Sequence, residues 1–507
     1  MSASPPYLTT IPIDILEQIL LRLPTQDIIK VESINRYFRD LVRDLPTLQH
    51  RRELFAIGLI DNPYRPCDLT ERRKQCKGYM HKWTNATSVM RSTYELLPTR
   101  SSSWGAAKYS GNGLLVSSSL RHKRLAFLHV PPVASRKSVE SWTIPPLPFR
   151  IMCYAVYPPE NVIAVAESKE NLICIHFLSL QDGSPFYVLP SNTIVWELPP
   201  SANLIGGYEI AITASRIMMH FPYRSEGPLS DGDVWRIVVW DRKTRNVVLD
   251  LLSTDESELV KRYPQVVFLD EFRMVVIPDK FWSLELVVFD TLIPQNHPGN
   301  VQRLELPPRF YDQLANIRVD HDRDLGILST DEALIADPSQ AVLVIELLGG
   351  NFEPTVLVVV RMQVLIERKY PVRADSRVSW DEWGRHIVAR EVLVNSARIL
   401  TFVHGSQVMV VQKFFPGSWS LRGHQPHCVR TFDFSRRGFL PLRDGADRTE
   451  KRVVFEHGAD FRFEPDEGME LWDRLHSLSD GSFFHLGTPS DGHGLDNTLQ
   501  LQLWEPV

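Results

Sequence analysis

The sequence predicts an α+β multidomain chain in which a small helical module precedes a much larger all-β domain. Two observations support this prediction. Apolar residues recur at helical spacing over residues 11–42, and from about Ser88 onward short β-branched and aromatic runs alternate with Gly, Pro, Asn and Asp. The length of 507 residues allows more than one domain. We expect residues 1–45 to form the helical module, 46–88 a helical linker and 89–507 the β-rich domain.

Three short helices are expected in the module. The first is predicted by Pro12, which suits a first helical position, and by apolar residues at helical spacing, namely Ile15, Leu16, Ile19, Leu20 and Leu23. Thr25 and Asn35 are residues of the N-cap type, and they predict the starts of the second and third helices. Helices this short hold more apolar surface than they can hide among themselves, so a protein partner is expected.

The order of residues from Ile11 to Leu41 reads I-P-x-D-I-L-x-x-I-L-x-x-L-P-x-x-D-I-I-x-V-x-x-I-N-R-x-F-R-x-L. This order resembles the F-box without a gap. It departs from the family at three positions: Ile11 stands where Leu is usual, Asn35 where Cys or Ser is common, and Phe38 where Trp is often found. The resemblance implies a helical module that binds a Skp-type adaptor, and through it the cullin and RING subunits of an SCF-type ubiquitin ligase. The adaptor-binding residues that it implies are Ile11, Pro12, Ile15, Leu16, Ile19, Leu20, Leu23, Ile28, Ile29, Val31, Ile34, Phe38 and Leu41.

The linker is predicted to hold two helices, one from Thr47 to about Gly58 and a basic one from Leu69 to about Trp83. This segment is similar to a group of fungal F-box proteins. The run Arg72-Arg73-Lys74 allows a nuclear signal or a nucleic-acid patch, but the solvated face of a connecting helix is the favoured interpretation.

For residues 11–42, the alternative to the F-box is an ordinary helical hairpin packed on its own domain.

Composition fits an adaptor rather than a nucleic-acid or membrane protein. The net charge of −5 gives no general attraction to nucleic acid or to an anionic membrane, and no apolar run is long enough to span a bilayer. The five cysteines are scattered and odd in number, which indicates free thiols in a reducing compartment, the cytoplasm or the nucleus.

A loose repeat indicates the architecture of the β-rich domain. Five strand-like runs share an apolar core with a polar residue in their last two positions, namely Leu125–Val130, Leu172–Phe177, Trp235–Asp241, Leu284–Asp290 and Ala341–Glu346. These polar residues (His129, His176, Asp241, Asp290 and Glu346) recur at intervals of 47, 65, 49 and 56 residues. Such spacing predicts a divergent β-propeller of about seven blades, with a β-sandwich pair or a helical repeat as the alternatives.

Particular segments are assigned to this propeller. Trp240-Asp241 resembles the end of a WD repeat, although the usual Gly-His partner upstream is missing. The sixth unit is predicted to hold Ile387–Ala389 and Val408–Val411, and the seventh Val453–Phe455. Met90–Leu97 is expected to supply a strand that closes the ring against the last blade.

No motif predicts catalysis, a metal site or a cofactor. His424, His427 and Cys428 form a small cluster that lacks an evident fourth ligand, and the run His321–Asp324 resembles a catalytic loop only in composition. The acidic pairs Asp381-Glu382 and Asp466-Glu467 fall on expected turns. Seven tryptophans are candidates for a recognition face, although most are expected in the core, namely Trp142, Trp196, Trp282, Trp380, Trp383, Trp419 and Trp472.

The sequence therefore predicts a non-catalytic substrate receptor of a ubiquitin ligase, with a protein substrate bound by the β-rich domain through residues that it does not identify. The alternatives are an adaptor-binding protein that does not direct degradation, and a propeller enzyme with a regulatory F-box.

Overall fold

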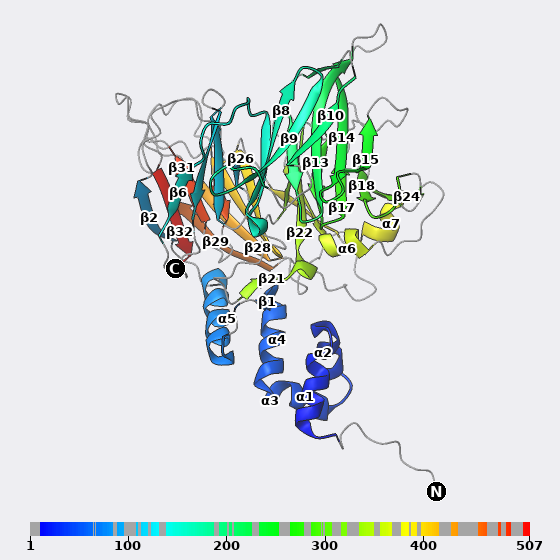
Figure 1. Ribbon diagram of the computed structural model, residues 1–507. Helices are drawn as coiled ribbons and strands as arrows, with labels where there is room; N and C mark the ends of the chain where they lie inside the picture. Colours follow the sequence, from blue (N-terminus) through cyan, green and yellow to red (C-terminus); the bar gives the residue numbers. More distant parts are fainter. Residues whose placement is uncertain are drawn as a thin grey trace.

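The computed structural model describes residues 11–506 apart from a set of segments, of which the longer are 96–107, 131–137, 226–232, 253–263, 278–284, 307–315, 322–333, 349–354, 368–376, 415–426, 434–454, 464–474 and 488–499. Figure 1 shows a large body of β-sheets with a group of helices projecting from one side. These helices are α1 (Ile13–Leu21), α2 (Thr25–Glu32), α3 (Arg36–Asp44), α4 (Pro46–Ala56) and α5 (Leu69–Thr84). The predicted order, a three-helix module, two linker helices and then strands, agrees with the structure except that a short strand, β1 (Leu59–Asp61), lies between the two linker helices.

The helix starts confirm one predicted cap and correct another. The side chain of Asn35 accepts a hydrogen bond from the backbone N–H of Phe38 at 3.0 Å, so Asn35 caps α3 as expected. Thr25 is instead the first residue of α2, and Pro24 precedes it with φ −54° and no side-chain cap. Pro12 takes the same place before α1, one residue earlier than predicted. The fixed φ of proline suits the entry into a helix, and neither of these two starts has a side-chain cap.

The β-strands of the described residues form seven sheets of four or five strands. The first two are β3 (Lys108–Tyr109), β4 (Leu114–Ser119), β5 (Arg124–His129) and β6 (Glu140–Thr143), then β7 (Cys153–Tyr157), β8 (Val162–Lys169), β9 (Leu172–Ser179) and β10 (Thr193–Glu197). The third holds β11 (Ala202–Leu204), β12 (Glu209–Ile212), β13 (Arg216–Ser225), β14 (Asp233–Asp241) and β15 (Val247–Leu252). The fourth holds β16 (Gln265–Phe268), β17 (Arg273–Ile277), β18 (Glu285–Asp290), β19 (Val301–Glu305) and β24 (Arg377–Val378).

The last three sheets complete the β-rich domain. They are β20 (Asn316–His321), β22 (Val342–Leu348), β23 (Thr355–Arg361) and β25 (Ile387–Val392), then β26 (Ala397–His404), β27 (Gln407–Phe414), β28 (His427–Asp433) and β29 (Phe455–Phe463), and finally β30 (Leu475–Ser477), β31 (Phe483–Gly487), β32 (Gln500–Pro506) and β2 (Val89–Glu95). Two short helices, α6 (Met362–Glu367) and α7 (Trp380–Trp383), lie between β23 and β25. The domain is a β-propeller, as predicted.

The number of regular blades differs from the prediction of about seven. Among the described strands, five sheets have the four strands of a regular blade, and the other two have a fifth strand. In one, the long strand β13 pairs along the same edge with two short strands, β11 and β12. In the other, β24 adds to β19 in parallel. The irregular sheets arise because these edges still have free hydrogen-bonding groups that an extra short strand can use.

The core of the propeller lies between neighbouring sheets. In β17, Met274 and Val276 pack with residues of the third sheet, whereas Val275 and Ile277 pack with residues of the fifth. Alternate side chains of a strand point to opposite faces, so each central sheet is buried on both sides. Further clusters join the first sheet to the second, the second to the third and the fifth to the sixth, which places the sheets in chain order.

The N-terminal strand of the β-rich domain closes the ring. Strand β2 pairs antiparallel with β32, from Val89 opposite Pro506 to Glu95 opposite Gln500. The closing role predicted for Met90–Leu97 is therefore confirmed over the residues that belong to β2.

Two later strand assignments were wrong. Ile387–Ala389 belongs to β25 of the fifth sheet rather than to the sixth unit, and Phe455 begins β29 of the sixth sheet rather than belonging to the seventh. In the first, second and fourth sheets the repeated run is the third strand, and in the third sheet it is β14, the fourth of five strands. In the fifth sheet, Ala341–Glu346 overlaps β22, which is the second strand. The chain is long between β20 and β22 and again between β28 and β29. The strands therefore do not recur there at the regular intervals on which the prediction depended.

Candidate protein-binding site on the N-terminal helices

The three-helix module has a small core of its own. Its buried residues are Leu16, Leu20, Ile28, Phe38, Leu41, Val42 and Leu48. Five of these are among the residues predicted to bind an adaptor, and Leu48 comes from α4. Ile11, Leu23 and Val31 are half-buried against the same core. These side chains hold the module together and fix the shape of its surface.

The outer surface of the module carries a group of exposed isoleucines, which we call the isoleucine patch: Ile13, Ile15, Ile19, Ile29 and Ile34. Ile15 is 54% exposed and Ile34 is 64% exposed. Among the described residues, nine large apolar side chains are exposed, and five of them belong to this patch. Exposed apolar side chains of this number on a small module leave apolar surface that a protein partner can cover.

The thirteen predicted residues fall into three groups, exposed, half-buried and buried. Leu16 is 2% exposed, whereas its neighbour Ile15 points outward, and the same relation holds for Leu20 and Ile19. On a helix, residues i and i+4 share a face, so Ile15 with Ile19 and Leu16 with Leu20 form two adjacent stripes. Pro12 is also exposed. Ile13 was missed, although its position in the first helical turn of an apolar sequence was a usable signal.

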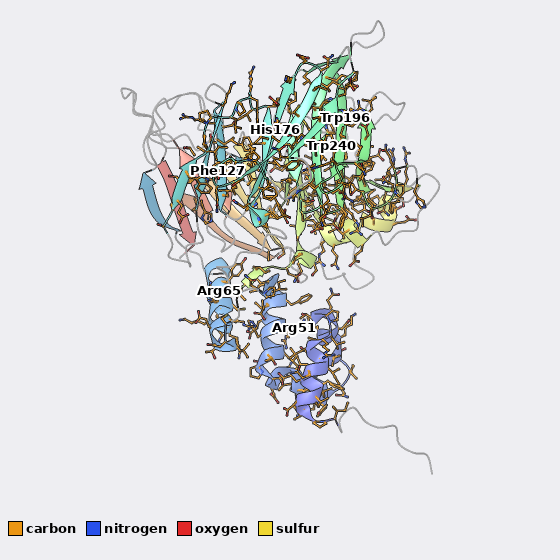
Figure 2. The ribbon with its side chains drawn as sticks, in the orientation of Figure 1. Arg51, Arg65, Phe127, His176, Trp196 and Trp240 are labelled. Atoms are coloured by element: carbon orange, nitrogen blue, oxygen red, sulfur yellow. The ribbon has the colours of Figure 1, made fainter. Side chains whose placement is uncertain are left out.

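Helix α4 is tied to α1 and α2 by polar contacts. Thr47 donates a hydrogen bond to the carboxylate of Glu17, and the guanidinium of Arg51, labelled in Figure 2, donates to the carbonyl of Leu21. Arg52 Nη1 lies 3.2 Å from Glu32 Oε1. Together with Leu48 in the core, these contacts make α4 part of the module, beyond residue 45 where the sequence analysis placed the boundary.

A buried histidine and an aspartate connect α4 to the segment that follows it. His50 Nε2 lies 2.9 Å from Asp61 Oδ1, and Arg72 Nη1 lies 3.1 Å from Asp61 Oδ2. Burial acts to raise the pKa of the Asp61 carboxyl, but the hydrogen bond from His50 and the charges of His50 and Arg72 outweigh it and hold this pKa below its usual 3.8. Asp61 is therefore an ionised anchor at neutral pH.

Two side chains of the basic run Arg72-Arg73-Lys74 form ion pairs within the linker. Arg72 contacts Asp61, and Arg73 Nη2 lies 3.3 Å from Glu53 Oε1, while Lys74 is exposed. Two of the three cations are therefore paired within the linker, which agrees with the interpretation of a connecting helix.

The other candidates from sequence do not converge on a site in the described residues. His427 and Cys428 lie on β28, and His321 ends β20, but their side chains are outside the description, as are His424 and residues 322–324. Asp381 and Glu382 fall in the first turn of α7, and Asp466-Glu467 lies outside the described residues. No group of three metal-binding side chains comes together in the described part.

The tryptophans that the structure describes pack against other residues. Figure 2 labels Trp196 and Trp240, whose rings meet edge to face with centroids 5.7 Å apart. Trp142 stacks on Phe127, and Trp383 is buried and donates a hydrogen bond to the carbonyl of Glu305 at 2.7 Å. This agrees with the expectation that most are packing residues; Trp282, Trp419 and Trp472 lie outside the described residues.

Comparison with known proteins identifies the class of the N-terminal module. Residues 8–50 match the F-box domain, so the chain is a protein with an F-box domain followed by a β-propeller. This match includes the first five residues of α4. No curated protein sequence matches the chain.

Solved structures resemble the chain only at low identity. The WD40 domain of SCAP from fission yeast is 8% identical, with a TM-score of 0.39, over 82% of this chain and 98% of that one. Hsv2 from Kluyveromyces marxianus is 11% identical, with a TM-score of 0.38, over 78% of this chain and 95% of that one. An F-box domain together with a β-propeller is typical of non-catalytic adaptor proteins. Among the described helices, none has the length and apolar character needed to span a membrane.

Proposed function

We propose that the chain is a non-catalytic substrate-recognition subunit of an SCF-type ubiquitin ligase. The observation that carries this proposal is the isoleucine patch on the surface of the F-box domain. F-box domains bind Skp-type adaptors in general, and an adaptor that covers the patch would remove its apolar surface from water. Cullin and RING subunits would join through the adaptor.

The proposal gives different roles to the predicted adaptor-binding residues. Pro12, Ile15, Ile19, Ile29 and Ile34, together with Ile13, would contact the adaptor directly. Leu16, Leu20, Ile28, Phe38 and Leu41 would act from the core by holding these side chains in place, with Ile11, Leu23 and Val31 at the edge.

The topology favours one end of the propeller for a protein substrate. In an antiparallel sheet the turn between the first and second strands and the turn between the third and fourth lie at the same end. Strand β1 (Leu59–Asp61) of the linker pairs with β21 (Leu334–Ala336), which lies between β20 and β22, the first two strands of the fifth sheet. The linker therefore occupies this end. The opposite end, which carries the turn between β8 and β9, is left for the substrate.

The mechanism is proximity. A substrate on the propeller and a conjugating enzyme on the cullin would be held in one complex, and ubiquitin transfer would gain from the raised effective concentration. We also infer that the chain works in the cytoplasm or the nucleus, where its free cysteines stay reduced. The likeness to fungal F-box proteins supports a fungal origin.

The test is co-purification with a Skp-type adaptor. We expect the full chain to bind, and Ile15→Asp with Ile19→Asp to weaken binding about 100-fold or more, because two carboxylates would be buried without partners, a cost on the order of 3 kcal/mol. Both residues are exposed, so the double variant should keep its fold. Val195→Asp with Leu292→Asp changes two exposed apolar residues of the propeller and is the matched control.

The outcomes separate the alternatives. Failure of the folded wild-type chain to bind, or equal binding by the Ile15/Ile19 variant, would contradict the proposal. Binding to the adaptor without recruitment of a cullin would favour an F-box protein that does not direct degradation.

A further inference from the structure

Strand β10 lies at one end of the second sheet and presents an open edge. Among the described strands it pairs only with β9, while β7, at the other end of the sheet, contacts β12 of the third sheet. Strand β7 therefore lies toward the centre of the ring, and β10 lies toward its outer rim. Figure 2 labels one side chain of each outer strand, His176 on β9 and Trp196 on β10.

The direction of the backbone groups of β10 follows from its register. The N–H of Phe177 donates to the carbonyl of Asn192 at 2.8 Å, and the N–H of Leu198 donates to the carbonyl of Asn171 at 2.8 Å. In an antiparallel pair, such hydrogen-bonded positions alternate with positions whose N–H and C=O groups point away from the partner strand. Val195 lies midway between Asn192 and Leu198 with no break in the register, so its N–H and C=O point outward.

Neighbouring sheets close the equivalent edge with other parts of the chain. In the third sheet, the side chain of Gln295 accepts from the N–H of Asp250 on β15 at 3.1 Å and donates to the carbonyl of Asp250 at 2.8 Å. These two bonds are the ones that an added strand would make. In the fourth sheet β24 is itself an added strand, with Val378 opposite Leu304 of β19. The outer edges of this propeller therefore accept additional polypeptide.

Strand β10 lacks the features that usually protect an exposed edge. Its sequence, residues 193–197, holds no proline or lysine, and its pairing with β9 has no bulge. Val195, in the middle of the strand, is 58% exposed, and Cys174 lies opposite it on β9. Outward N–H and C=O groups beside an apolar side chain fit an extended polypeptide, which can pair with the backbone and cover the valine.

Charged residues near the end of β10 favour a particular sequence in that polypeptide. Glu197 is exposed and lies two residues after Val195, so its backbone groups also point outward. It lies opposite Leu172, which follows the β8–β9 turn, where Glu170 and Lys169 are exposed. The carboxylates outnumber the ammonium group, so a basic side chain is favoured here. Residues two apart on a strand share a face, so the segment would carry an apolar residue and, two positions away, Lys or Arg.

We infer that β10 is a docking edge for an extended segment of the substrate, which adds to the second sheet as a fifth strand with an apolar residue beside Val195 and a basic residue beside Glu197. The inference rests on the proposed function for the identity of this partner. Glu197 lies beside the β8–β9 turn, at the end of the propeller that the linker leaves open. A substrate bound at that end can therefore extend along β10.

The test uses the full-length chain without an adaptor and the peptide fluorescein-Thr-Val-Thr-Lys-Thr-Val-Thr-Lys-Thr-amide. We expect binding by fluorescence anisotropy, together with slower hydrogen exchange at the N–H groups of Val195 and Glu197, because an added strand covers them. A second peptide with Glu in place of both Lys residues should bind about tenfold more weakly, because its carboxylate would face Glu197.

Two variants locate the binding at this edge. Val195→Pro removes an outward N–H that β9 does not use, so the sheet should persist while the affinity for the Lys peptide falls about tenfold or more. Glu197→Lys should reverse the preference between the two peptides, and it keeps the test decisive if Val195→Pro fails to fold. Leu292→Asp changes a side chain that is 57% exposed elsewhere on the propeller, and it should leave both affinities unchanged.

Absence of peptide binding to the folded wild-type chain would overturn the inference, and so would an unchanged peptide preference in Glu197→Lys. A dimer of the unbound chain that Val195→Pro dissociates would also overturn it, because the edge would then belong to a second copy of this chain. Adaptor binding should be equal in all three variants, since the isoleucine patch is untouched. Failure of this inference is therefore distinguishable from failure of the proposed function.

Discussion

At the scale of single residues, His220 shows how burial sets protonation. It lies in β13, fully buried, with its ring centroid 4.9 Å from that of Trp235. Burial penalises the charged imidazolium and lowers the pKa of His220 from 6.5 to about 4. The folded chain therefore holds a neutral histidine through the range in which an unfolded chain becomes protonated.

This shift predicts a pH dependence of stability. Between pH 6.5 and 4 the unfolded chain binds the proton and the folded chain does not, so the free energy of unfolding should fall as the pH is lowered through this window. The loss should reach about 3 kcal/mol at the acid end. His220→Leu should remove most of this slope, measured as the apparent Tm at several pH values. An equal slope in both proteins would contradict the assignment.

Other residues show where local sequence signals succeed. Asn35 caps its helix because its side chain needs only the backbone N–H of Phe38, three residues along the chain. Four of the five residues of the isoleucine patch were in the predicted face, and Ile13 was not. Which apolar residues are buried depends on the packing of α4 against the module, because Leu48 of α4 joins the core of the first three helices.

At the scale of elements, two neighbouring sheets share the same arginine–aspartate ion pair at the end of two paired strands. The WD-like sequence indicated only the aspartate of the first pair. Arg216 begins β13 and lies opposite Asp241, the last residue of β14, with which it forms an ion pair. In the next sheet Arg273 begins β17 and lies opposite Asp290, the last residue of β18, 3.3 Å away. Asp241 therefore pairs with Arg216, whereas a WD repeat would have the histidine of its Gly-His motif.

The first of these pairs also joins two sheets. Arg216 Nε donates to Thr291 Oγ1 at 2.9 Å, and Thr291 follows β18 of the next sheet. Asp241 Oδ1 accepts from the backbone N–H of Thr244 at 2.8 Å and so orders the turn after β14. One buried cation thus connects a turn, a strand pair and a neighbouring blade.

We predict that Arg216→Met lowers the free energy of unfolding of the propeller by about 3–5 kcal/mol, because Asp241 and Thr291 would lose a buried partner. Lys30→Met removes an exposed pair with Asp27 and is the control, with an effect within about 0.5 kcal/mol. Urea unfolding followed by tryptophan fluorescence measures the first, and helical circular dichroism the second. If Arg216→Met lowers the free energy of unfolding by less than about 1 kcal/mol, the pair of Arg216 and Asp241 does not stabilise the propeller as predicted.

At the scale of the whole molecule, the first strand of the β-rich domain closes the propeller. Strand β2 gives the last sheet its fourth strand. Strand β1 of the linker pairs with β21 and so connects the linker to the propeller. Because β2 pairs only with β32, it is an edge strand in which alternate N–H groups face β32 and the outside. Loss of β2 would leave β32 as an open edge.

Ring closure can be tested with two adjacent prolines. Ser92 lies opposite Leu503 and Thr93 opposite Gln502, so only one of their N–H groups points to β32. We predict that one of Ser92→Pro and Thr93→Pro lowers stability by about 1–3 kcal/mol and promotes aggregation, while the other is tolerated. Each variant is the control for the other in thermal unfolding and light scattering. Equal tolerance of both would mean that β2 does not close the ring in solution.

The sequence by itself determined the order and type of most elements, the propeller class and the closing strand, because these depend on local periodicity, on caps and on apolar runs of strand length. The F-box domain was indicated by the resemblance of residues 11–41 to that family. Only the tertiary structure decided which strands share a sheet, which isoleucines stay exposed, and how the linker meets the propeller. Those features depend on pairs far apart in the chain, such as Phe55 with Gln340 and Gly58 with Ser406. Sequence spacing holds no signal for such pairs, since the loops that bring them together vary in length.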